Sequence, residues 1–144
     1  MNEEIKMIPH AYPMLMIDRI VEKESFKWVK GYKNISANEW FMNRHSPLPS
    51  MPSVLIIEAI GQIGAYVLEE KEEEKEEEKE EETGILAAIN GVTIHGEAIP
   101  GDRLDLFFEV TKRRKGIFRG RGTACVNGQL IVEVEDITVL YIKT

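Results

Sequence analysis

The sequence predicts an α+β fold in which antiparallel strands surround one long helix, and three features indicate this class. Two β-rich segments come first, one apolar helical run follows them, and four further β-rich segments fill the C-terminal half. No strand-helix-strand unit repeats along the chain, so a parallel sheet lacks the connections that it needs. With 144 residues, 43% of them apolar, we expect a single domain over residues 1–144.

The strands are predicted from apolar and aromatic patterns. Residues 12–21 (YPMLMIDRIV) form a β-rich apolar run, and residues 26–36 (FKWVKGYKNIS) alternate aromatic residues with lysines. Four more strand-like segments follow residue 84, namely ILAAINGVTI, DRLDLFFEVTKRR, GIFRGRGTACV and QLIVEVEDITVLYI. The step Asn127-Gly128 between the last two is a strong signal for a two-residue hairpin turn.

The predicted helix covers residues 54–68 and is apolar on nearly every face, which is typical of a helix enclosed by other structure. We expect Ser50 or Ser53 to cap its N-terminus. Gly61 and Gly64 each lower helix propensity by about 1 kcal/mol relative to alanine. That cost is tolerated where another backbone comes close, so the glycines predict a helix pressed against the sheet.

The net charge of −7 comes from one segment of the chain. Residues 69–82 hold eleven Glu and three Lys, a net −8, and the remainder therefore carries +1. Opposite charges meet there only at i,i+3, whereas like charges recur at i,i+4, so electrostatic support for a helix is weak. We expect an acidic, solvated extension of the central helix that frays and ends near Thr83-Gly84.

The chain shows the features of a cytoplasmic protein. Its first ten residues lack a charged-then-apolar leader, and the apolar run is interrupted by Glu58 and Gln62 and too short to span a bilayer. The single cysteine, Cys125, cannot form an intramolecular disulfide, which fits a reducing compartment. Because Cys125 lies inside a predicted strand without a nearby basic partner, we interpret it as a small core residue rather than a nucleophile. We expect no nucleic-acid partner and no membrane insertion.

Two side chains are candidates for chemistry. His45 lies in a proline-rich loop, and Glu58 follows thirteen residues later among apolar helix residues. A carboxylate in such surroundings requires a raised pKa or a partner, which makes Glu58 a functional candidate. The alternatives are a solvent-facing or strand-paired Glu58, and a His45 that serves at the surface or in packing. His10 and His95 show no metal-ligand spacing and no nucleotide-binding motif is present, so we expect neither a metal nor another cofactor.

Four segments carry a resemblance to a known family: IPHAYPMLMIDRI, KNISANEWF, HSPLPSMPSVLIIEAIGQ and PGDRLDL. In this order and spacing the chain resembles the FabZ-type 3-hydroxyacyl-ACP dehydratases (FabA/FabZ hot-dog family) along essentially its whole length. The resemblance implies that His45 and Glu58 match the family's catalytic histidine and helix carboxylate. The chain departs from the pattern at Arg44 and Ser53, where the family has glycine, and at Ser46, where it has phenylalanine. The spacing from His45 to Glu58 is also one residue shorter.

The resemblance further implies a hot-dog fold, with a highly curved antiparallel sheet around one helix. It implies a homodimer, often assembled as a trimer of dimers, in which each active site takes its histidine and its carboxylate from different subunits. The implied reaction is dehydration of (3R)-3-hydroxyacyl-ACP to trans-2-enoyl-ACP in fatty-acid or related acyl-chain biosynthesis. The backbone N–H of Ser53 is the expected oxyanion donor, because it lies at a helix N-terminus. A catalytically weakened acyl-binding or structural hot-dog protein and an acyl thioesterase are the alternatives.

A cluster of positive charge surrounds the predicted hairpin that follows residue 111. We call it the cationic cluster, and its members are Lys112, Arg113, Arg114, Lys115, Arg119 and Arg121. The simplest interpretation of such a cluster is solubility. The functional alternative is the docking of an acidic acyl carrier protein by Arg113, Arg114, Lys115, Arg119 and Arg121, since the rest of the chain is nearly neutral.

Overall fold

The computed structural model describes residues 15–43, 45–68 and 82–143 of the chain. The elements in these ranges are β1 (Arg19–Glu24), β2 (Trp28–Asn34), α1 (Ser53–Gly64), the 3-10 helix η2 (Ala65–Leu68), β3 (Glu82–Ile94), β4 (Arg103–Arg114), β5 (Ile117–Val126) and β6 (Gln129–Lys143). The predicted order of two strands, one helix and four strands is confirmed.

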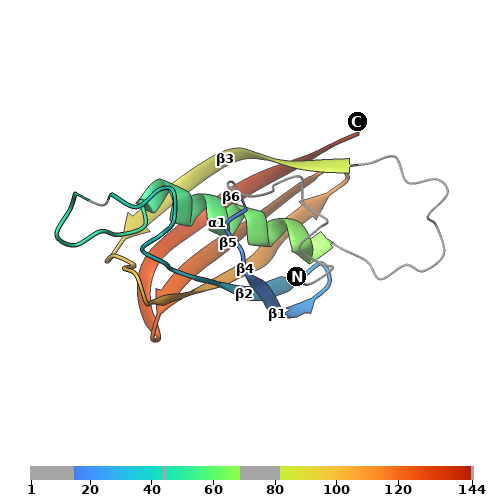
Figure 1. Cartoon of the computed structure of the whole chain (residues 1–144). Coiled ribbons are helices and arrows are strands. Elements are labelled where there is room, and N and C mark those ends of the chain that lie inside the picture. The colour runs from blue at the N-terminus through green and yellow to red at the C-terminus, as the bar shows by residue number, and fades with distance from the viewer. Residues whose placement is uncertain (1–14, 44, 69–81, 144) are drawn as a thin grey trace.

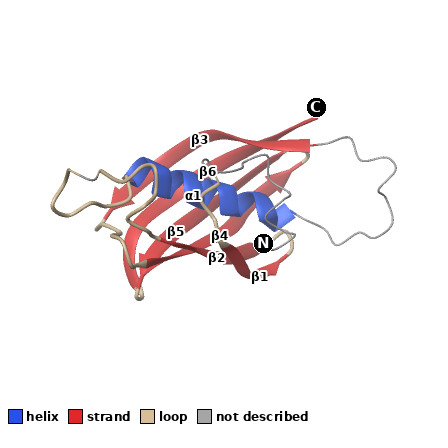
Figure 2. Ribbon diagram, viewed as in Figure 1, coloured by secondary structure: helices blue, strands red, loops and turns tan. Residues whose placement is uncertain are grey.

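The strands form one antiparallel sheet in the order β1-β2-β4-β5-β6-β3. The sheet curves, and α1 lies along its concave face (Figures 1 and 2). Strands β1 and β3 are the two edges of this sheet. The chain leaves the sheet at the end of β2 and enters α1 through the loop between them. This loop contains His45.

Alternation along the strands builds the core between sheet and helix. In β5 every second side chain is buried, as expected for a strand with one face on a core and the other on solvent. The inward residues of β4 and β6 meet those of β5 and the buried face of α1. This core includes Ile56, Ile60, Ile63, Leu104, Leu106, Phe108, Phe118, Val132, Val134 and Ile137.

The two helix glycines differ in their surroundings. A Cβ atom on Gly64 would lie 2.8 Å from Cδ2 of the buried Phe108, so the predicted close approach is confirmed there, although the neighbour is a side chain rather than a backbone. At Gly61 a Cβ would meet Leu86 at 3.5 Å, an ordinary contact. The helix is not enclosed on every face, because Val54 is exposed. In the described ranges, no helix combines the length and the apolar content needed to cross a membrane.

The start of α1 differs from the prediction. Pro52 is the N-cap residue, with φ −54° and ψ 136°, and no side chain hydrogen-bonds to the helix end. Neither Ser50 nor Ser53 therefore caps the helix. The reason is that Ser53 is already the first helical residue, so its backbone does not have the extended conformation of a cap.

Strand β3 begins earlier than the sequence predicts, since the prediction places the first strand residue after the acidic run at Ile85. Strand β3 begins at Glu82, which pairs with Lys143, and Thr83 and Gly84 continue the pairing with β6. A long neighbouring strand thus supplies backbone partners that local sequence could not reveal. Residues 69–81 of the extension lie outside the described residues.

The hairpin between β5 and β6 confirms the prediction from Asn127-Gly128. Both residues have positive φ, 50° for Asn127 and 78° for Gly128, which is the backbone signature of a type I′ turn. Such a turn matches the right-handed twist of its strands, and it fixes the register of Val126 opposite Gln129.

Candidate active site

Glu58 lies in the second turn of α1 and is half-buried. Its Oε1 accepts a hydrogen bond from Nε2 of Gln62 at 3.2 Å. Residues four apart lie on the same helix face, so the helix itself brings these two side chains together. Glu58 therefore has the polar partner that its apolar surroundings require.

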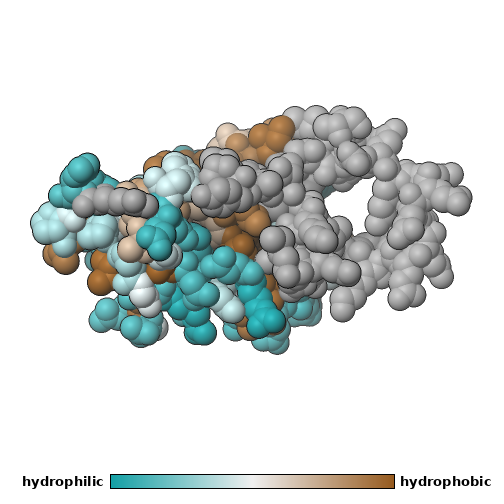
Figure 3. Space-filling model, in the orientation of Figure 1, coloured by the Kyte–Doolittle hydropathy of each residue, from teal (hydrophilic) through white to brown (hydrophobic). Residues whose placement is uncertain are grey.

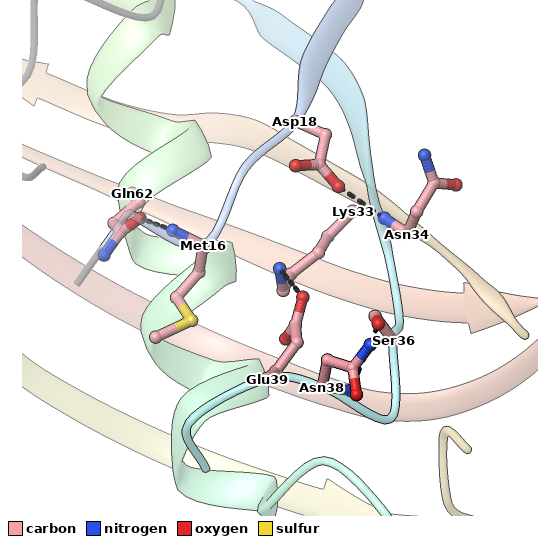
Figure 4. Close-up of polar contacts among 8 residues, drawn as sticks. All are labelled: Met16, Asp18, Lys33, Asn34, Ser36, Asn38, Glu39 and Gln62. Atoms are coloured by element: carbon pink, nitrogen blue, oxygen red, sulfur yellow. Dashed lines mark hydrogen bonds and ion pairs between the residues drawn. The ribbon is translucent and has the colours of Figure 1, made fainter. Parts of the chain in front are cut away.

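Gln62 is itself held in place. It is buried, and its Oε1 accepts the backbone N–H of Met16 at 2.8 Å (Figure 4). The segment before β1 thereby fixes which end of the Gln62 amide faces Glu58, because the oxygen is engaged and the NH2 group must point the other way. Reasoning from the sequence missed Gln62, although the i,i+4 spacing from Glu58 in an apolar helix was a signal that could have found it.

His45 lies in the loop between β2 and α1, which extends beyond the N-terminal end of the helix (Figure 1). Its side chain is exposed, and its backbone N–H donates to Oδ1 of Asn43 at 3.0 Å. The two ends of the loop are bound to one segment before β4. Ile35 N–H donates to Asp102 O at 2.9 Å, and Met51 N–H donates to Ala98 O at 2.9 Å.

His45 and Glu58 thus occupy different elements with different exposure. The hydrogen bond of His45 is local to its loop, and the hydrogen bond of Glu58 runs along α1 to Gln62. Neither contact links the two side chains. Arg44, which precedes His45, lies outside the described residues.

The first turn of α1 carries the amide that the sequence singled out. The N–H groups of Leu55 and Ile56 donate to the carbonyl of Pro52 at 2.9 and 3.2 Å. The N–H of Ser53 comes before them, at the end of the helix where the dipole is positive and where amides lack partners within the helix. An anionic oxygen is the chemical group that such an amide binds.

In the part of the chain that the structure describes, no group of three or more His, Cys, Asp or Glu side chains is arranged to hold a metal ion. His95, one of the histidines considered for this role, has its Nε2 3.1 Å from Oε1 of Glu133 on the neighbouring strand β6.

Strand pairing divides the cationic cluster. Arg119 forms a two-pronged ion pair with Asp136, with Nε 3.1 Å from Oδ1, and Arg121 pairs with Glu109. The hydrogen bond between Arg119 and Asp136 raises the pKa of the guanidinium and lowers the pKa of the carboxyl. These two arginines are therefore largely neutralised by cross-strand carboxylates.

The remaining members of the cluster lie at the tip of the β4–β5 hairpin and are exposed. Arg113 lies over the ring of Phe26, with its guanidinium carbon 4.2 Å from the ring centroid. This contact ties Arg113 to the β1–β2 turn. Arg114 is opposite Ile117 at the end of the β4–β5 pairing, and Lys115 follows it in the turn.

A curved antiparallel sheet packed on one central helix defines the hot-dog class of proteins. Residues 8–135 match the family model described as FabA-like domain. The chain belongs to the FabA-like family, as its resemblance to the FabA/FabZ group predicts.

Named relatives are similar in sequence to this chain over nearly its whole length. It is 44% identical over 136 residues to a 3-hydroxyacyl-[acyl-carrier-protein] dehydratase FabZ of Bacillus subtilis, covering 93% of each chain. It is 43% identical over 142 residues to the protein of the same name in Clostridium beijerinckii, covering 96% of each.

Solved structures of low identity share the fold. The dehydratase heterocomplex ApeI:P from Xenorhabdus doucetiae gives a TM-score of 0.80 at 17% identity, over 97% of this chain and 91% of the other. The E. coli PaaI protein from the phenylacetic acid degradation operon gives a TM-score of 0.62 at 12% identity, over 88% and 80%. At these identities the likeness shows the hot-dog fold alone, and the predicted fold class is confirmed.

Proposed function

We propose that this chain dehydrates (3R)-3-hydroxyacyl thioesters of acyl carrier protein to trans-2-enoyl thioesters in fatty-acid biosynthesis, as a lyase. The observation that carries the proposal is the helix carboxylate Glu58, held by Gln62, in a chain 44% identical to a relative named for this reaction. Elimination of water needs one group that removes a proton and another that gives one. His45 and Glu58 are the proposed groups.

In the proposed mechanism His45 is the base. Its neutral imidazole takes the proton from C2 of the substrate, and the electron pair of that bond forms the C2–C3 double bond as the C3–oxygen bond breaks. A protonated Glu58 gives its proton to the departing C3 hydroxyl, which leaves as water. Gln62 donates to Oε1 of Glu58 and so helps to hold the carboxyl in place for this step.

Negative charge develops on the thioester oxygen while the C2 proton leaves. The N–H of Ser53 at the start of α1 is the proposed donor to that oxygen. A backbone amide serves this role in a serine as well as in a glycine, so the residue change at this position leaves the donor in place.

We infer that the working unit is a dimer in which His45 of one copy acts with Glu58 of the other. Edge strand β3 supports this inference, because it is 13 residues long and carries exposed Ile85, Val92 and Ile94. Figure 3 shows hydrophobic surface along the upper margin of the molecule, where β3 runs. A long apolar edge strand is a site for pairing with another chain. Most soluble oligomers are homo-oligomers, so a second copy of this chain is the proposed partner.

The partner that delivers the substrate is proposed to dock at the tip of the β4–β5 hairpin. Arg114 and Lys115 are exposed there and lie apart from the carboxylates that neutralise Arg119 and Arg121. An acyl carrier protein is acidic, so exposed cations at one end of the molecule favour its approach.

One experiment separates the three candidate activities. Purified protein is incubated with a 3-hydroxyacyl thioester, and enoyl product and free thiol are both measured. Enoyl product without thiol supports the dehydratase, whereas thiol release would identify a thioesterase. Neither product would favour an acyl-binding protein, the alternative that the exposed His45 on a shortened loop supports. The proposed function fails in both of those cases.

A further inference from the structure

Lys33 of β2 points to the buried face of the sheet, where a lysine is rarely found. Burial alternates along β2, and Val29, Gly31 and Lys33 share the inward face. Lys33 is opposite Leu104 of β4 in the register, and Leu104 is fully buried. An ammonium group at such a position must be paired, because an isolated charge in apolar surroundings is strongly unfavourable.

The partner of Lys33 is Glu39, in the loop that carries His45. Lys33 Nζ lies 2.7 Å from Glu39 Oε1, and the two side chains are only 8% and 17% exposed. The same ammonium lies 5.9 Å from the ring centroid of Phe41, two residues further along the loop. Figure 4 shows the lysine reaching from β2 to the loop, so the pair joins two segments that run in different directions.

The Lys33–Glu39 pair is not expected to stabilise the fold more than apolar side chains at these positions would. Glu39 Oε2 is buried and finds no hydrogen-bond partner among the described residues, so one carboxylate oxygen is desolvated without full compensation. Two well-packed apolar side chains of similar size stabilise a fold as well as, or better than, a buried ion pair. What the ion pair adds is a fixed geometry between its two segments.

Hydrogen bonds within the loop connect Glu39 to the segment around His45. Met42 N–H donates to Glu39 O at 3.0 Å, and the Met42 side chain is buried in the core. Asn43 then accepts from His45 N–H at its Oδ1, 3.0 Å away, and from Ser46 N–H at its carbonyl, 3.2 Å away. Local hydrogen bonds thus run from Glu39 to both sides of His45.

We propose that Lys33 and Glu39 are positioning residues, which hold the loop and thereby aim the His45 imidazole for proton removal. The catalytic half of this inference rests on the function proposed above. The anchoring half, that the ion pair fixes the loop, stands on the contacts alone. Neither residue is proposed to touch the substrate.

The test replaces both charges together, so that no unpaired charge remains buried. The variant is Lys33→Met with Glu39→Leu. The matched control is Lys27→Met with Glu24→Leu, which removes the exposed pair at the β1–β2 turn, where the nitrogen and oxygen are 3.0 Å apart and the side chains are 68% and 52% exposed. For each full-length protein, kcat and KM are measured on a small 3-hydroxyacyl thioester. Thermal unfolding and backbone hydrogen exchange of residues 36–46 are measured alongside.

We expect the buried-pair variant to fold with a thermal midpoint close to that of the wild type, while residues 36–46 exchange faster. Its kcat should fall roughly 10- to 100-fold, the range that follows from moving a catalytic group by about 1 Å. KM should stay within about two-fold, because the pair does not contact substrate. The control variant should match the wild type in every measurement.

Wild-type exchange and wild-type kcat in the folded variant would overturn the inference. So would faster exchange with an unchanged kcat, since the loop would then not position the base. If the double variant does not fold, Glu39→Gln keeps the size and an acceptor oxygen, and it should show smaller changes of the same sign; no change in either readout would again overturn the inference. If the wild type itself makes no enoyl product, the proposed function fails, and the exchange data decide the anchoring half by themselves.

Discussion

Gln62 Nε2 lies 3.2 Å from Glu58 Oε1 on one face of α1, while Gln62 Oε1 accepts the backbone N–H of Met16 at 2.8 Å. The amide therefore cannot rotate without losing one of two hydrogen bonds. Because Gln62 is buried, the lost bond would not be replaced by water. The arrangement orients the Glu58 carboxyl through its Oε1.

Replacing Gln62 by leucine should therefore lower kcat of the dehydration about ten-fold, because Glu58 loses its orienting donor. Steady-state kinetics on a 3-hydroxyacyl thioester measure the effect. The decisive control is the same change in a Glu58→Ala background, where it should have little further effect, since the two residues act as one unit. Independent, multiplying effects would show that Gln62 acts on something other than Glu58.

His45→Ala and Glu58→Ala should each lower kcat/KM by at least about 100-fold, because each removes one of the two groups that move a proton. Both proteins should remain folded, since His45 is exposed and Glu58 is half-buried. The combined variant should be little worse than either single variant. Near-normal turnover in one of them would remove that residue from the mechanism.

The same two variants test whether a site takes residues from two copies. When His45→Ala and Glu58→Ala chains are unfolded together and refolded in equal amounts, half of the dimers contain one of each. In such a dimer one of two sites is intact, so activity should recover to about a quarter of the wild-type value. Recovery does not occur if both residues of a site come from one chain, and an inactive mixture that contains mixed dimers would show that.

Gly64 and Gly61 give opposite predictions for the same substitution. Gly64→Ala puts a methyl group 2.8 Å from the ring of buried Phe108, and the clash should lower the free energy of unfolding by about 1–3 kcal/mol. Gly61→Ala meets only an ordinary contact at 3.5 Å, so the better helix propensity should raise it by about 0.5–1 kcal/mol. Denaturant unfolding at fixed protein concentration measures both, and equal shifts would contradict the packing at Phe108.

These two glycines show how far sequence reasoning reaches. Both predicted a helix pressed on a sheet, but only the three-dimensional structure shows that Phe108 faces Gly64 rather than Gly61. Local signals were sufficient where the structure depends on neighbours in sequence, as in the Asn127-Gly128 turn with its two positive φ values. The start of β3 at Glu82 was missed because it depends on pairing with the distant strand β6.

The candidate site divides in the same way. His45 and Glu58 were predicted from residue type, surroundings and family resemblance, whereas the contact that fixes Gln62 beside Glu58, from Met16, depends on tertiary structure. The Lys33–Glu39 pair could not be predicted, because a lysine in an alternating strand is expected to face solvent, and its inward position is tolerated only through a loop residue.

Cys125 gives a prediction about pH. Burial, and then the charge of Asp105, raise the pKa of its thiol. At any pH below that pKa the thiolate fraction is smaller than in a free cysteine, so alkylation at pH 8 should be slower than for a small thiol and should accelerate as pH rises. Asp105→Asn removes one cause and should speed alkylation at pH 8. An unchanged rate in that variant would show that Asp105 does not act on the thiol.

The last prediction concerns the cationic cluster, whose members differ in their partners. Arg114 and Lys115 are exposed at the hairpin tip, whereas Arg119 is paired with Asp136. If the tip steers an acidic carrier protein, Arg114→Glu with Lys115→Glu should raise KM for a carrier-protein substrate several-fold and flatten its dependence on salt. Turnover of a small thioester should be unchanged, because the tip is not part of the proposed chemistry.

The comparison matched in charge is Arg114→Gln against Arg119→Gln, since each variant removes one positive charge. Asp136 already neutralises Arg119, so Arg119→Gln should affect KM for the carrier-protein substrate less than Arg114→Gln does. An equal effect of these two single variants would mean that total charge matters rather than the hairpin tip. If the tip variant also slows the small thioester, the cations act on the active site or the fold, and the docking role proposed for Arg114 and Lys115 is wrong.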